Sequence, residues 1–292
     1  MATAFSRKHV WVMAFIGFFG SAFGIDAPTG LAVAPIDYTQ AACNIDCSAR
    51  LSWTAPAGSP TGYRVYRRLA ANENPTLAGT VTTTSFTDSA AAVGENYLYT
   101  VTAVDAEGES TESSSVSFRK VENVVLGSKG YGSWNSYKDL RGPSSNLNDA
   151  STSTGISGID GGGAMTYTFM AESRPKLVCA RIYASAWGTS ADSQKFFGSV
   201  WRDNAVVGNK KFDGTDASST WRFTANAWGV YPVSGSVADD VWNAVSYGNG
   251  VWYPAAAEIE AYGYIPGALL GAPSDFAATV ANNQVELSWT AA

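Results

Sequence analysis

The chain has 292 residues, of which 15% are charged and 13% aromatic, and its formal net charge is −6. This length suits two domains, and the hydrophobic fraction of 46% is ample for packed cores. An acidic chain with scattered Lys and Arg repels phosphate backbones, which argues against nucleic acid as a partner. The single histidine, His9, lies in a leader-like segment, so His-based catalysis and His metal ligands are excluded from the rest of the chain.

Residues 1–24 are predicted to be a secretory signal peptide. Arg7 and Lys8 supply its positive region, and residues 10–20 form an apolar run too short to span a bilayer. Small residues precede the predicted cut after Gly24. The alternative is an uncleaved anchor helix. We expect a secreted or cell-surface protein, because no later segment of the sequence is apolar enough to cross a membrane.

Residues 25–119 are predicted to form an antiparallel β-sandwich. Short alternating runs occur at 51–53, 63–67, 80–86, 97–104 and 113–118, and a turn is expected at 105–108. In the fourth run Tyr97, Tyr99, Val101 and Ala103 share one face, as expected of a strand that packs on a core.

Several motifs of this block belong together. They are Ala27-Pro28, Leu51-Ser52-Trp53, Gly62-Tyr63-Arg64-Val65-Tyr66 and the segment YLYTVTAVDAEG at 97–108. With these motifs the block resembles a fibronectin type III domain. The resemblance implies that Trp53 is the core tryptophan of the second strand and that the Tyr97 hydroxyl bonds back to nearby backbone.

The chain has three cysteines, and two of them lie in a long loop of the first block. Cys43 and Cys47 are close enough in sequence to form a local disulfide, which an oxidising compartment permits. Cys179 lies in an alternating run and is expected to be a buried small hydrophobe.

Residues 120–265 are predicted to form a second β-sandwich, an eight-stranded jelly roll. Its opening, 124–163, is rich in Gly, Ser and Asn. Strand-like runs follow at 165–169, 177–185, 195–201, 221–225 and 258–264.

Two motifs of the second block, and a third with a looser match, suggest a family. Asn148-Asp149-Ala150-Ser151-Thr152-Ser153-Thr154 forms an early loop, Ala256-Ala257-Glu258-Ile259-Glu260-Ala261-Tyr262-Gly263 forms a closing strand, and residues 197–204 are broadly similar to a middle strand and turn. With these motifs the block resembles the discoidin, or coagulation-factor C-type, family, which includes galactose-binding-like carbohydrate-binding modules. Two features depart from the family pattern: Ala150 replaces the usual glycine, and Gly155 and Ile156 stand where a tryptophan often occurs.

The resemblance implies a structural calcium site shared by the loop and the closing strand. Calcium prefers six to eight oxygen ligands, which carboxylates, hydroxyls and carbonyls provide. The implied ligands are Asp149, Ser151, Thr154 and Glu258. The alternative is an Asx-turn at Asp149 and a solvated Glu258.

Exposed aromatic side chains in loops are the expected sugar-binding groups, because sugar rings stack on them. The second block holds seven of the ten tryptophans. The alternative is that these large aromatics fill the core. Trp228 is a further loop aromatic. The predicted ligand-binding residues are Trp134, Tyr137, Arg141, Trp187, Trp252 and Tyr253.

Residues 266–271 are predicted to be a linker, and residues 272–292 repeat the start of the first block. Ala272-Pro273 matches Ala27-Pro28, and LSWTA at 287–291 matches LSWTA at 51–55. This segment reads as the truncated start of another fibronectin type III-like domain. Two strands cannot bury a core alone, so the expectation is a fragment of a larger protein or completion by another molecule.

No catalytic constellation is evident in the sequence. Asp239 and Asp240 point to opposite faces if extended, and Glu258 and Glu260 share a face at a generic spacing. No nucleophile elbow, phosphate loop or HExxH motif occurs. We therefore expect a non-catalytic accessory protein that binds a glycan or cell-surface polysaccharide through its second domain. The alternatives are a structural or adhesive modular protein that contacts its own copies or further modules, and the N-terminal part of a larger secreted glycan-active enzyme.

Overall fold

The computed structural model describes residues 24–69, 72–127, 129–137, 140–158, 164–170, 173–184, 196–202, 205–210, 226–234, 242–248, 255–266, 274–281 and 284–290. The regular structure in these ranges is β-strand, apart from one short 3-10 helix at Ser144–Leu147. The expectation of an all-β protein is confirmed. No helix in these ranges is long and apolar enough to span a bilayer.

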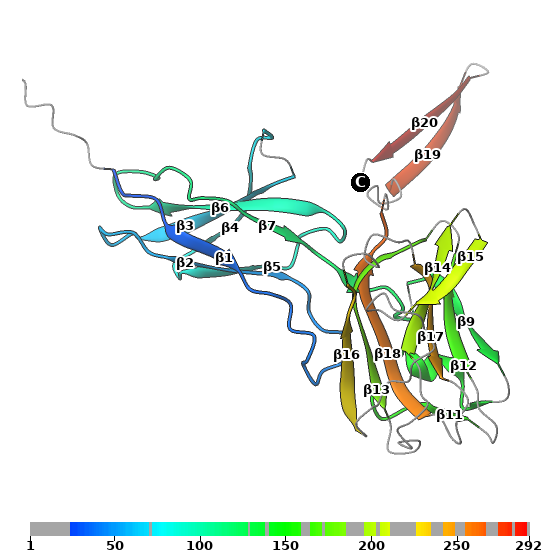
Figure 1. Cartoon of the computed structure of the whole chain (residues 1–292). Coiled ribbons are helices and arrows are strands. Elements are labelled where there is room, and N and C mark those ends of the chain that lie inside the picture. Colours follow the sequence, from blue (N-terminus) through cyan, green and yellow to red (C-terminus); the bar gives the residue numbers. More distant parts are fainter. Residues whose placement is uncertain are drawn as a thin grey trace, which may run out of the picture.

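The first sandwich consists of two antiparallel sheets (Figure 1). One sheet has the order β1-β2-β5 and the other has the order β4-β3-β6-β7. The predicted run at 80–86 is corrected: residues 82–84 bend, so it divides between strands of different sheets. The strands are β1 (Thr29–Val33), β2 (Ala49–Thr54), β3 (Gly62–Arg68), β4 (Thr76–Val81), β5 (Ser85–Asp88), β6 (Asn96–Val104) and β7 (Val116–Arg119).

The core of this sandwich follows the alternation of β6. Tyr99, Val101 and Ala103 are buried in one cluster with Trp53, whose ring meets Tyr63 edge-on at 5.3 Å. Tyr97 packs against the same cluster, and its hydroxyl accepts a hydrogen bond from the backbone N–H of Ala92 at 3.4 Å. The structure therefore places Trp53 and Tyr97 as predicted.

The second sandwich also has two antiparallel sheets. One has the order β10-β11-β18-β13-β16, with β8 paired to β18, and the other has the order β15-β14-β17-β12-β9. The first sheet contains β8 (Glu122–Asn123), β10 (Leu140–Arg141), β11 (Ile156–Gly158), β13 (Lys176–Ala184), β16 (Ala227–Pro232) and β18 (Ala255–Tyr264). The second contains β9 (Gly132–Tyr137), β12 (Ala164–Phe169), β14 (Phe196–Arg202), β15 (Ala205–Lys210) and β17 (Trp242–Gly248).

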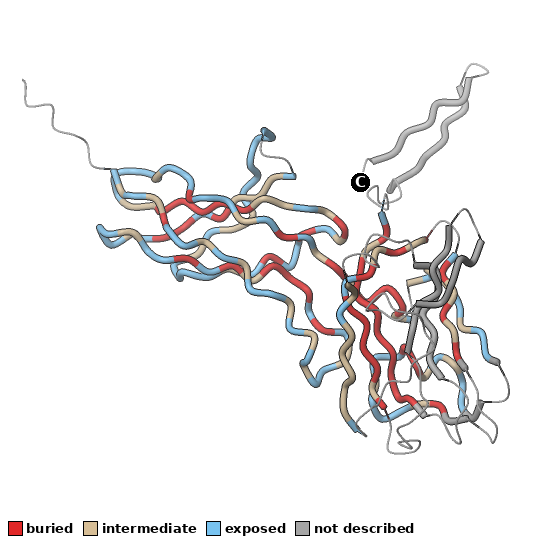
Figure 2. The backbone as a smooth tube through the Cα atoms, in the orientation of Figure 1, coloured by how far each residue is buried: buried red, intermediate tan, exposed pale blue. Residues whose placement is uncertain are grey.

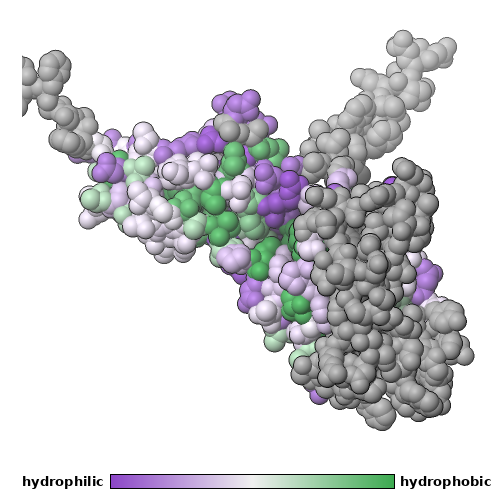
Figure 3. Space-filling model, viewed as in Figure 1, coloured by the Kyte–Doolittle hydropathy of each residue, from purple (hydrophilic) through white to green (hydrophobic). Residues whose placement is uncertain are grey.

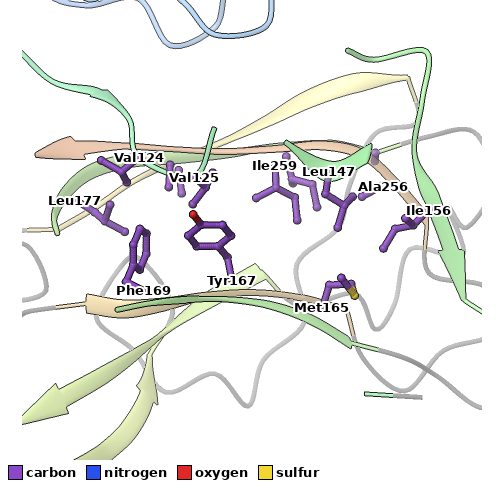
Figure 4. Packing of buried hydrophobic residues seen from close by; sticks show 14 residues of the cluster. Val124, Val125, Leu147, Ile156, Met165, Tyr167, Phe169, Leu177, Ala256 and Ile259 are labelled. Carbon is purple, nitrogen blue, oxygen red and sulfur yellow. The ribbon is translucent and has the colours of Figure 1, made fainter. Parts of the chain in front are cut away.

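Side chains from the two sheets meet in an apolar core (Figure 4). Leu177 and Ile259 point inward from one sheet toward Tyr167 and Phe169 of the other. Four of the predicted runs fall on β12, β13, β14 and β18, whereas the run at 221–225 lies outside the described residues.

A separate hairpin near the end of the chain pairs β19 (Ser274–Ala281) with β20 (Gln284–Thr290). Its backbone register repeats that of β1 and β2. Ser274 opposes Thr290 and Ala277 opposes Ser288, just as Thr29 opposes Thr54 and Ala32 opposes Ser52. An irregularity follows the first pair in both hairpins, so the repeat seen in the sequence extends to the register of strand pairing.

The two sandwiches meet at a packed junction. Only Lys120 and Val121 separate β7 from β8, and Val121 is buried. The loop between β1 and β2, residues 34–48, extends from the first sandwich and lies beside β16 (Figure 1). Figure 2 shows β13 and β18 buried in this part of the second sandwich. In Figure 3, apolar residues gather in the middle of the first sandwich and again near the junction.

Candidate functional site

The outward face of the β18-β13-β16 sheet carries charge, although it is buried. Along β18, Ile259 and Ala261 belong to the apolar core, while Glu258, Glu260 and Tyr262 alternate with them. Arg181 on β13 lies directly opposite Glu260 on β18. On this face the ionisable side chains of Arg181, Glu258 and Glu260 are each 0% exposed. Loop 34–48 covers this face, and we call the contact the loop joint.

Arg181 is the centre of the loop joint. Its Nη1 donates to the carbonyl oxygens of Tyr38 at 3.1 Å and Gln40 at 2.7 Å, and its Nη2 donates to that of Ala42 at 2.5 Å. Its Nε donates to Glu260 Oε2 at 2.5 Å. The guanidinium also stacks 3.8 Å from the ring centre of Trp228. A planar fork with several donors suits such an array of carbonyls, and a lysine would not reproduce it.

Glu260 is fully engaged on the other side of the pair. Its Oε1 accepts the backbone N–H of Asn44 at 2.5 Å, and its Oε2 also accepts the Tyr262 hydroxyl at 2.6 Å. That hydroxyl accepts the N–H of Ile45 at 2.9 Å. Asn44 adopts a φ of 51°, a left-handed conformation that asparagine tolerates better than most residues. The buried Arg181 and Glu260 charges are therefore paired and hydrogen-bonded, which burial requires.

Apolar contacts surround this polar centre. Ile45, Cys47, Val121, Cys179 and Tyr262 form one buried cluster, against which Tyr38 packs with its ring centre 5.2 Å from that of Tyr262. The cluster joins residues of the loop, the link between the sandwiches and the second sandwich. The loop joint thus combines ion pairing and apolar packing, as the interior of a domain does.

The predicted calcium residues lie together at one end of β18. The backbone N–H of Ala150 donates to Glu258 Oε1 at 3.3 Å, and the Thr154 hydroxyl donates to Asp149 Oδ2 at 2.7 Å. Burial and, after it, the nearby charge of Glu260 raise the pKa of Glu258 to about 8, against the opposing effect of the backbone N–H groups of Ala150 and Ser151.

Glu258 Oε2 is buried without a hydrogen-bond partner. An orphaned carboxylate oxygen near the charge of Asp149 fits a hard cation such as Ca²⁺. Within the described ranges no group of three or more His, Cys, Asp or Glu side chains could hold a metal. Backbone carbonyls and hydroxyls of the loop would therefore have to supply most ligands, as the inclusion of Ser151 and Thr154 already implied.

The structure corrects two of the aromatic predictions. Trp134 lies on β9 instead of in a loop, packs against the core and meets Tyr167 edge-on at 5.2 Å. Trp228 lies on β16, where its Nε1 donates to Ala41 O at 3.1 Å beneath the loop. Neither indole is presented as an open stacking platform.

The other predicted ligand residues are not tested by side-chain geometry. Tyr137 ends β9, and Arg141 ends β10. Trp187, Trp252 and Tyr253 lie outside the described residues.

The predicted Cys43–Cys47 disulfide is absent from the structure, in which all three cysteines are free thiols. The two side chains have different surroundings. Cys47 is buried in the apolar cluster, whereas Cys43 is half-buried, and burial together with the charges of Glu260 and Glu258 raises its pKa to about 11. The loop turns between them at Asn44.

Sequence reasoning did not identify Arg181, Tyr262 or the loop as one site. It treated Glu258 and Glu260 as a generic same-face pair. The available signal was a charged residue in each of two apolar strands, Arg181 in 177–185 and Glu260 in 256–263. Such charges are seldom buried unless they are paired.

Residues 27–119 match the family model of the fibronectin type III domain. A poly(3-hydroxybutyrate) depolymerase from Ralstonia pickettii is 44% identical over 92 residues, which are 31% of this chain and 16% of that protein. Exoglucanase B from Cellulomonas fimi is 41% identical over 83 residues, 28% of this chain and 6% of that protein.

Among solved structures, an Fn3-like protein from Clostridium thermocellum is 29% identical. The match covers 32% of this chain and 90% of that one, with a TM-score of 0.28. The chain spans less than a fifth of the length of the depolymerase and of the exoglucanase. Together with the three-plus-four arrangement of its strands, the family match shows that residues 27–119 are a fibronectin type III domain.

Proposed function

We propose that this chain is a secreted, non-catalytic accessory unit in which the fibronectin type III domain holds a polymer-binding β-sandwich in one fixed orientation. The observation that carries the proposal is the loop joint, where Arg181 ties three carbonyls of loop 34–48 to the second sandwich. A flexible spacer would leave this face of its neighbour in water. Here the loop covers a charged pair, and buried charges are tolerated only while their partners stay in place.

The proposed ligand is a glycan, bound through the aromatic side chains of Trp187, Trp252 and Tyr253. In support, one relative is named as an exoglucanase, a name that refers to a glycan polymer. The other is named for poly(3-hydroxybutyrate), also a polymer, which makes that polyester the necessary comparison ligand. We also propose that the second sandwich is a discoidin-like jelly roll, supported by the contact between the Asp149 loop and Glu258.

Binding is tested with the full mature chain on a glycan array and by sedimentation with insoluble glucan and with poly(3-hydroxybutyrate) granules. We expect a single-site Kd of about 10 µM to 1 mM for a glycan, because stacking and hydrogen bonds compete with water. Trp252→Ala or Trp187→Ala should weaken binding without lowering Tm. The matched control, Trp134→Ala, should lower Tm because this indole packs in the core. Binding to no glycan would overturn the ligand proposal and favour a structural or adhesive role.

The fixed orientation of the two domains is tested separately by limited proteolysis. The loop joint predicts that the Lys120-Val121 bond, which lies between the two sandwiches, resists protease in the native chain. Arg181→Met should open the joint and make the link sensitive. Equal cleavage of the wild-type chain and the Arg181→Met variant would contradict the fixed orientation and leave the ligand proposal unaffected.

A calcium ion held by Asp149, Ser151, Thr154 and Glu258 is proposed as a structural element of the second sandwich. Its support is the unpartnered, buried Glu258 Oε2. Added Ca²⁺ should raise Tm, because it binds the native state. At a hundredfold excess over Kd this binding raises the free energy of unfolding by about 2.7 kcal/mol. Asp149→Ala should abolish that rise, and Glu107→Gln, an exposed turn carboxylate of the first domain, should not. An unchanged melt with Ca²⁺ and with chelator would remove the metal.

A second candidate function is a module within a larger secreted polymer-degrading enzyme. The two relatives favour it, because both are named as enzymes and each matches less than a third of this chain. The shared register of β19–β20 and β1–β2 supports a further fibronectin-like module in such an array. The coding sequence around this segment decides between the two candidates.

A further inference from the structure

Two of the three cysteines lie together within the loop joint. Cys47, on the covering loop, and Cys179, on β13, are 4% and 1% exposed and belong to the same small apolar cluster. Their positions in the chain are 132 residues apart, so only the docking of the loop brings them together. Cys43 is not part of this cluster.

Electrostatics agrees with this proximity. Burial raises the pKa of both thiols to about 12, and a negative charge on Cys47 further raises the pKa of Cys179. Burial raises the pKa of Tyr38, which packs against the same cluster, and charges on the two thiols raise it further. The charges that act on Cys43 are instead those of Glu260, Glu258, Arg181 and Asp149.

We propose that Cys47 and Cys179 form a disulfide when the chain folds in an oxidising compartment, and that this bond fastens loop 34–48 to the second sandwich. The cross-link differs from the local Cys43–Cys47 bridge that the sequence suggested. It leaves Cys43 as the free thiol.

The oxidant is a small-molecule disulfide such as oxidised glutathione, or the disulfide of a thiol oxidoreductase. The thiolate of one cysteine attacks a sulfur of the oxidant, forms a mixed disulfide and releases one thiol. The thiolate of the second cysteine then attacks the protein sulfur of that mixed disulfide and releases the second thiol. Two protein thiols lose two electrons and two protons, and the oxidant is reduced to two thiols.

The raised pKa values indicate when this happens. A thiol with a pKa of about 12 is almost never a thiolate near neutral pH, so exchange is slow once the loop has docked. The bond should therefore form during folding, before the cluster closes. The folded reduced chain should oxidise slowly, and denaturation followed by refolding with oxidised glutathione should restore the bond.

Peptide mapping tests the pairing directly. The full chain, secreted into an oxidising compartment, is denatured at acid pH with N-ethylmaleimide and cut without reduction by trypsin and an Asp-specific protease. Cleavage before Asp46 separates Cys43 from Cys47. We expect residues 46–50 linked to residues 177–181, with Cys43 alkylated. A link from residues 37–45 to either peptide, or three alkylated cysteines, would overturn the proposal.

Matched variants distinguish the bond from a general packing effect. Reductant should lower the Tm of the wild-type chain by about 10 °C, because the bond closes a long loop. Cys43→Ala should keep this sensitivity, and Cys179→Ala should lose it. Equal sensitivity in the two variants contradicts the cross-link, whether or not Cys179→Ala is itself less stable.

Discussion

The two sandwiches place their charged residues differently. In the fibronectin type III domain the arginines of the ion pairs stay partly exposed, and Arg64, Arg67 and Arg68 keep 44%, 22% and 17% of their side-chain surface in water, although Asp88, the partner of Arg67, is buried. In the second sandwich Arg181 and Glu260 are fully buried on a sheet face that would otherwise meet water.

The difference lies in loop 34–48, which supplies carbonyls to Arg181 and N–H groups to Glu260 and Tyr262. The loop belongs by sequence to the first domain and by contacts to the second. Four experiments test this comparison.

The largest effect is expected from removing the buried cation. Arg181→Met leaves Glu260 buried without its partner and should cost about 3–5 kcal/mol in the free energy of unfolding. The control Arg64→Met removes a partly exposed ion pair and should lower the free energy of unfolding by at most about 1 kcal/mol. Thermal melts of the full chain compare them, and Arg181→Met/Glu260→Gln should recover part of the loss. Similar costs for the two single variants would show that the loop joint is no more important than a surface pair.

Removing the core tryptophan tests whether the domains are coupled. Trp53→Ala should destabilise the fibronectin domain by about 3–5 kcal/mol, as truncation of a buried aromatic does. Because this domain holds the loop, the second sandwich should also melt earlier. Hydrogen exchange at β13 and β18 measures that coupling. Unchanged protection there while the first domain opens would show that the loop stays docked independently.

The Glu258 carboxyl should make stability fall with rising pH. Its pKa is about 8 in the folded chain against an ordinary value of 4.5, so between these values the folded state binds more protons than the unfolded state. Stability therefore decreases from pH 4.5 to 8, by an amount of order a few kcal/mol. Denaturant unfolding should show a flatter pH profile for Glu258→Gln, and for the wild type with saturating Ca²⁺. Superimposable profiles would contradict the raised pKa.

The smallest effect concerns Ala150, the residue that departs from the glycine of the family pattern. It adopts a φ of 62°, which glycine accepts without steric cost. Ala150→Gly should stabilise the second sandwich by about 1 kcal/mol. The control Ala106→Gly, in an exposed turn of the first domain, should not stabilise it. A destabilised Ala150→Gly variant would show that the loop is held in another conformation.

The sequence by itself determined the features that depend on local patterns of residues. Alternation along residues 97–104 predicted the buried face of β6, and the LSW motif predicted the core position of Trp53. Through the resemblance to the discoidin family, the sequence also predicted that the Asp149 loop lies beside Glu258. The structure places the two in contact.

Only the tertiary structure decided the rest. Trp134 looked like a loop residue because its neighbours are Gly, Ser and Asn, yet pairing with β12 makes this segment a strand and turns the indole toward the core. Arg181, Glu260 and Cys179 looked like ordinary strand residues. Their burial depends on a loop 139 to 143 residues away from Arg181, and a contact at that separation leaves no periodic trace in the sequence.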